Sequence, residues 1–136
     1  MTRGWLGRGA LCLSFLLTLF PPIRAQQRRD PLNQLEIDQL RDAMLDPDER
    51  LKLYVQFSRD RMAKLEQMRN DPKTNERGLR THDMLQDFLT IYDELNDNVD
   101  MYVGRKNDIR KPMKLVIQAD TEFQARLRAI KDSANA

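Results

Sequence analysis

Cysteine is almost missing from this chain of 136 residues, since Cys12 is the only one and lies in an apolar run near the N-terminus. If that run is removed, the remaining chain has no disulfide, no thiolate nucleophile and no cysteine-ligated metal. Small secreted eukaryotic domains usually depend on disulfides. An exported chain without cysteine is more typical of a bacterial envelope protein.

Residues suited to catalysis are also few. His82 is the only histidine, and Ser58 and Ser133 are the only serines after residue 25. No nucleophile and base can be paired from this set, and the chain has no Glu-x-x-His motif and no glycine-rich phosphate loop. His82 could ligate a metal or haem or act as a general base, but a surface histidine is the simpler interpretation. We expect a protein that is not an enzyme and that holds no cofactor or metal.

Residues 1–25 have the order of parts of a cleavable signal peptide. The first ten residues hold two arginines and no acid, residues 10–20 are almost wholly apolar, and two prolines then precede Ala25. A positive start, an apolar run and a small residue at the cut define such a signal. The run is shorter than the roughly 20 residues that cross a bilayer. We therefore expect export to the periplasm or the medium, with the working protein beginning near Gln26.

Removing the signal also changes the charge. The chain has 23 basic and 21 acidic residues, and three of the arginines lie in residues 1–25. The remaining chain then has 20 basic residues and a net charge of −1. General binding to nucleic acid requires a strong positive field, so we expect no nucleic-acid partner.

Glycine is scarce after the signal, where Gly78 and Gly104 are the only two. Long stretches rich in Leu, Met, Gln, Glu, Lys and Arg favour helix, and no alternating β-branched run predicts a sheet. We expect a flexible leader at 26–31, one helical bundle domain at 32–131 and a disordered tail at 132–136. Methionines at helical spacing are expected mainly in the core.

Four helices are predicted. The first is short and covers 32–45; the second begins at the Asp46-Pro47 cap, where Glu49 suits a capping box, and runs to about residue 69. The third runs from 76–78 to 103, with Gly104 as a left-handed C-cap. The fourth begins after 107–108 and ends near 131.

The third predicted helix has the most regular apolar pattern. Its apolar residues are spaced alternately by three and four: Leu85, Phe88, Tyr92, Leu95, Val99 and Tyr102. Such a seam is typical of helices that pack in a bundle. The fold class predicted is all-α, an antiparallel bundle of three long helices plus one short N-terminal helix. A helical hairpin that dimerises to complete its core is the alternative.

Charge is segregated along the third and fourth predicted helices. Asp93, Asp97 and Asp100 share one helix face, which suggests an acidic docking face or a divalent-cation site. Five cations follow within ten residues: Arg105, Lys106, Arg110, Lys111 and Lys114. They suggest contact with anionic lipid or another polyanion. The alternative for the acidic residues is a solvated face balanced by a neighbouring helix. The alternative for the basic residues is capping of the third helix at its C-terminus together with pairing to the acidic face just upstream.

The segment from Leu45 to Leu51 resembles the cap-and-helix segments of small periplasmic stress chaperones of the Spy and CpxP type. Those proteins are also exported, cysteine-poor and all-helical. Their Leu-Thr-x-x-Gln repeat is missing here, so we do not assign the chain to that family.

Three functions remain open from the sequence. We expect first an exported, non-enzymatic helical-bundle protein of the bacterial envelope that binds another macromolecule, in an interaction or chaperone-like role. Its partner would be an envelope protein or a second copy of itself. The second possibility is a peripheral binder of anionic lipid or polyanion through residues 105–114. The third is a helical protein that binds a divalent metal.

Overall fold

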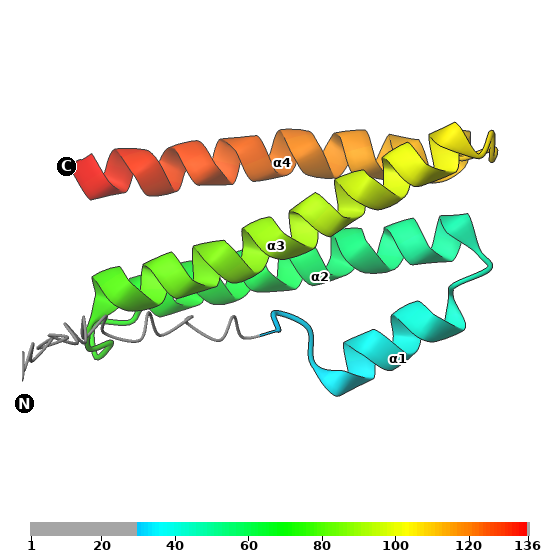
Figure 1. The fold of residues 1–136 in the computed structure, drawn as a ribbon. Coiled ribbons are helices and arrows are strands. Elements are labelled where there is room, and N and C mark those ends of the chain that lie inside the picture. The colour runs from blue at the N-terminus through cyan, green and yellow to red at the C-terminus, as the bar shows by residue number, and fades with distance from the viewer. Residues whose placement is uncertain (1–29, 136) are drawn as a thin grey trace, which may run out of the picture.

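The computed structural model describes residues 30–135, which form four helices and no strand (Figure 1). The helices are α1 (Gln34–Asp42), α2 (Pro47–Asn70), α3 (Arg77–Gly104) and α4 (Arg110–Asn135). This confirms the predicted bundle of three long helices with one short helix before them. The predicted signal peptide, Cys12 and most of the leader lie outside the described residues. Residues 132–135, expected in a tail, continue α4.

The starts of α1 and α2 follow from their capping residues. Asn33 Oδ1 accepts the backbone N–H of Glu36 at 3.0 Å, and Glu36 Oε2 accepts that of Asn33 at 2.9 Å, so α1 begins with a complete capping box. At α2, Asp46 Oδ1 accepts the N–H of Glu49 at 3.1 Å, and Pro47 takes the first helical position. Glu49 makes no return bond, so only half of the predicted box forms at α2.

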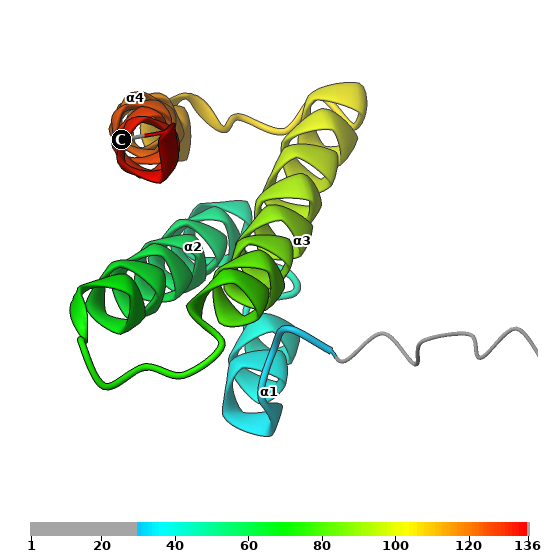
Figure 2. The same ribbon diagram turned by 90° about the vertical axis from the view of Figure 1, so that its left-hand side faces the viewer.

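Helix α2 is the centre of the bundle. It packs against each of the other three helices, while the backbones of α3 and α4 do not approach closely (Figure 2). Aromatic rings bridge α3 and α4 instead. The Phe88 ring meets Phe123 edge-on with 5.1 Å between centroids, and Tyr92 meets Phe123 in the same way at 5.8 Å. Large rings therefore hold α4 away from α3.

The core confirms the apolar pattern predicted for the long helices. The six residues of α3 that were predicted to form its apolar seam are all buried or half-buried in the core. The most buried apolar side chains come from three helices: Leu51, Met62, Leu65, Ile91, Leu95 and Ala119. All the apolar residues of the core, and those packed against it, lie between Leu32 and Ile130. A chain beginning at Gln26 therefore keeps the whole described core.

Polar side chains fasten the helices to α2. Arg50 of α2 donates through Nη1 to the carbonyl of Leu40 in α1 at 2.5 Å and through Nε to Asn98 Oδ1 in α3 at 2.9 Å. Arg59 of α2 donates to Glu122 of α4 at 3.1 Å. Each of the three neighbours of α2 is thus tied to it by a specific hydrogen bond.

A second tie joins α1 to α2 through Glu36 and Arg61, which are 7% and 8% exposed. Neither residue stood out in the sequence, because a charged residue at either place is expected at the surface.

None of the helices in residues 30–135 is both long enough and apolar enough to span a bilayer.

Candidate functional site

The predicted basic residues gather where α3 ends and α4 begins. The chain leaves α3 through a Schellman motif: Asn107 N–H donates to the carbonyl of Tyr102 at 3.0 Å, and Lys106 N–H donates to that of Val103 at 2.9 Å. Lys106 has φ of 60° and occupies the left-handed position. The prediction for Gly104 is therefore wrong. Gly104 is the last residue of α3, and a Cβ added there would meet nothing within 4 Å, so the helix includes this position before the chain reverses.

Arg110 is neutralised locally at the start of α4. Asp108 accepts Arg110 Nε at 2.9 Å on Oδ1 and Nη2 at 2.6 Å on Oδ2, and it also accepts the Arg110 backbone N–H at 3.3 Å. These hydrogen bonds lower the pKa of Asp108 to about 2. Asp108 is therefore ionised at neutral pH, and its carboxylate forms an ion pair with the Arg110 guanidinium.

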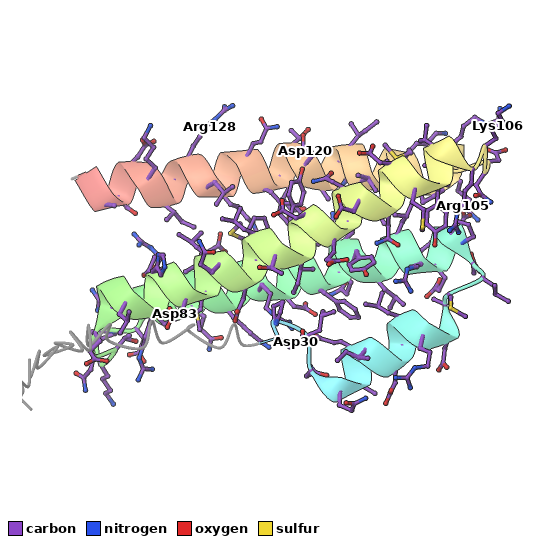
Figure 3. The ribbon with its side chains drawn as sticks, viewed as in Figure 1. Asp30, Asp83, Arg105, Lys106, Asp120 and Arg128 are labelled. Atoms are coloured by element: carbon purple, nitrogen blue, oxygen red, sulfur yellow. The ribbon has the colours of Figure 1, made fainter. Side chains whose placement is uncertain are left out.

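Lys111 is the second cation with an internal partner. Its Nζ lies 3.9 Å from Oδ2 of Asp48, in the first turn of α2. The other three predicted cations are exposed and make no side-chain ion pair or hydrogen bond within residues 30–135: Arg105, Lys106 and Lys114. Figure 3 shows Arg105 and Lys106 at the extreme end of the bundle. The structure therefore leaves three of the five predicted cations available to an external anion.

The acidic residues of α3 stay apart from this basic group. Asp93, Asp97 and Asp100 are exposed, and no ion pair in the described part of the chain involves them. The alternative in which the basic turn pairs with the acidic face does not occur. Within residues 30–135 no three acidic or histidine side chains are grouped so as to hold a metal ion. His82 is exposed near the start of α3, toward the other end of the bundle.

A cavity of about 350 Å³ lies between the segment before α1 and helices α2 and α3. Arg61 lines it, with Lys64, Met84 and Asp87 among its other wall residues. The Arg61 guanidinium is already occupied by Glu36 and by the carbonyl of Pro31. The cavity contains no nucleophile paired with a base, so its geometry does not indicate catalysis.

Sequence reasoning missed an apolar feature at the same end of the molecule as the cations. Met44 and Leu45 were predicted to belong to the first helix, but α1 ends at Asp42 and both lie in the turn before α2. Leu45 is 91% exposed and Met44 is 61% exposed. The Asp46 cap excluded Leu45 from the second helix, but no residue in the sequence marked the end of α1 at Asp42.

No family model matches the chain, and neither a curated protein nor a solved structure is significantly similar to it. Any functional proposal therefore depends on the residues and contacts described above.

Proposed function

We propose that this chain is an exported, non-enzymatic helical-bundle protein of the bacterial envelope that acts by binding another macromolecule. The observation that supports this proposal is a group of three cations at the α3–α4 end that have no partner within residues 30–135: Arg105, Lys106 and Lys114. They are exposed, and two nearby acids, Asp108 and Asp48, are engaged by Arg110 and Lys111.

The three cations without internal partners favour an anionic partner. Exposed cations without internal partners lose no ion pair when an anionic partner arrives, so their attraction to it is retained as binding free energy. Such attraction also accelerates association and weakens as salt screens it. The partner surface that fits this end is therefore anionic, and binding to it is sensitive to ionic strength.

The test compares two triple variants in a chain that begins at Gln26. One changes Arg105, Lys106 and Lys114 to Ala; the matched control changes Arg128, Lys73 and Lys131 to Ala. The control residues are exposed, come from the opposite end and remove the same charge. We expect the first variant to elute from an immobilised polyanion at lower salt than the parent, with the control shifted much less. Equal shifts in both variants would show that net charge alone governs binding.

The export part of the proposal has its own experiment. The full chain, expressed in a bacterium with an envelope, should yield a soluble envelope form whose mass begins at or near Gln26. Intact mass spectrometry of that fraction measures the cut. A full-length chain retained in the cytoplasm would refute export without affecting the binding test.

A further inference from the structure

The end of the bundle that presents the free cations also presents apolar side chains. Leu45 and Met44 lie in the α1–α2 turn, and Val103, 59% exposed, lies in the last turn of α3. The α1–α2 turn and the α3–α4 connection are at the same end of the molecule (Figure 1). The contact of Lys111 Nζ with Asp48 Oδ2 at 3.9 Å joins the first turns of α4 and α2 there.

The α1–α2 turn holds its apolar side chains in a defined place. Met44 N–H donates to the carbonyl of Arg41 at 3.2 Å, and Asp46 N–H donates to that of Ala43 at 3.1 Å. Ala43 itself is buried, at 6% exposure. The turn is therefore anchored on both sides of Leu45, and its exposure follows from an ordered backbone.

A water-soluble surface gains nothing from exposing two successive large apolar side chains at a fixed turn. A partner that buries them gains free energy in proportion to the apolar area removed from water. The partner must also satisfy Arg105, Lys106 and Lys114. A soluble polyanion satisfies only the cations, whereas an anionic bilayer offers charged headgroups with apolar chains directly beneath them.

We propose that this end of the bundle docks on the surface of an anionic lipid bilayer. Met44 and Leu45 enter the headgroup region, and the three free cations contact the headgroups. Asp42 and Asp46 flank the apolar pair, so the insertion is shallow and peripheral. This inference rests on the proposed function, because it names the chemistry of the anionic partner.

The first test reads the environment of the turn directly. The only tryptophan of the chain is Trp5, so a chain beginning at Gln26 has none. Leu45→Trp introduces a single reporter at the turn, and Leu79→Trp introduces one at an exposed position near the other end of the bundle. With vesicles of phosphatidylcholine and phosphatidylglycerol, we expect a blue shift of emission for Leu45→Trp and none for Leu79→Trp.

The second test measures partition into the same vesicles by sedimentation. The double change Met44→Ser and Leu45→Ser should reduce the partition coefficient on the order of tenfold, because two partly inserted side chains lose their apolar burial. The double change Leu35→Ser and Leu79→Ser is the matched control, since both residues are exposed leucines away from this end. It should leave partition unchanged. Circular dichroism confirms that each variant remains helical.

The outcomes separate this inference from the proposed function. Retention on an immobilised polyanion without any binding to anionic vesicles would overturn the bilayer inference and leave the proposed function standing. Vesicle binding that is lost on changing the three cations but is unaffected by the serine changes at the turn would overturn the apolar insertion. Binding to neither anionic surface would overturn both proposals.

Discussion

Glu36 and Arg61 form a two-point ion pair between α1 and α2. Arg61 Nη1 donates to Glu36 Oε1 at 2.9 Å, and Nη2 donates to Oε2 at 2.5 Å. The same carboxylate accepts the backbone N–H of Asn33, and Arg61 Nη2 also donates to the carbonyl of Pro31 at 2.6 Å. One glutamate therefore caps α1 and fastens it to the bundle, and one arginine holds the segment before α1 in place.

Replacing Glu36 by Gln should destabilise the fold by about 3 kcal/mol, because it leaves the buried Arg61 cation without its counter-charge. The free energy of unfolding in urea, followed by circular dichroism, measures the loss. Asp38→Asn is the control, since Asp38 pairs with Arg41 on the exposed side of the same helix. Its loss should be below about 0.5 kcal/mol. Equal losses in the two variants would contradict the structural role of the buried pair.

The same pair makes stability depend on acid. Burial alone would raise the pKa of Glu36, but the hydrogen bonds from Arg61 and Asn33 and the charges of Arg61 and Lys64 outweigh it, so the pKa lies below its ordinary value of 4.5. A carboxylate with a lowered folded-state pKa stabilises the fold above 4.5, and this contribution is lost as the pH falls through the folded-state value.

Unfolding measured in urea over a pH series tests this linkage. The stability difference between the parent and Glu36→Gln should be largest near neutral pH and should shrink progressively below pH 4.5. A difference that stays constant into strong acid would show that the pKa of Glu36 is the same in the folded and the unfolded protein, against the lowered value.

Two tyrosines of α3 should respond oppositely to loss of the hydroxyl. Tyr92 donates a short hydrogen bond to the Asp120 carboxylate of α4, and burial together with Asp120 raises the pKa of Tyr92 to about 12. Tyr92→Phe should therefore destabilise the fold by about 1–2 kcal/mol. The buried Tyr102 hydroxyl has no hydrogen-bond partner among the described residues. Tyr102→Phe should be neutral or stabilising by up to about 1 kcal/mol. Thermal unfolding of both variants against the parent measures the contrast.

The end of α3 offers a test of where the chain reverses. Gly104 is helical and has open space around it, so Gly104→Ala should stabilise the fold by roughly 0.5–1 kcal/mol. Lys106 holds φ of 60°, so Lys106→Gly should relieve strain of about 1 kcal/mol. Denaturant unfolding measures both changes. Destabilisation by Gly104→Ala would place the left-handed residue at Gly104 instead.

The helices were predictable because their signals are local. The Asp46-Pro47 cap and the alternating seam of α3 each act within a few residues, and α2 begins where the cap predicts. The Asn33 and Glu36 capping box was equally local, and the same spacing would have revealed it.

The features that define the candidate site depend on distant contacts. The pairing of Lys111 with Asp48 and of Glu36 with Arg61 joins residues far apart in the chain, and no periodicity encodes such pairs. The exposure of Leu45 arises because two caps close the flanking helices and leave the turn outside both. Which cations remain unpaired could therefore be known only from the packed structure.

The central place of α2 has a consequence for how the molecule opens. Helices α1 and α4 each pack on α2 and not on one another, so either can detach without breaking the contacts of the other. Native-state hydrogen exchange should accordingly resolve at least two separate opening reactions, with the amides of α2 exchanging last. A bundle built in this way can release its N-terminal helix while the α3–α4 end keeps its shape.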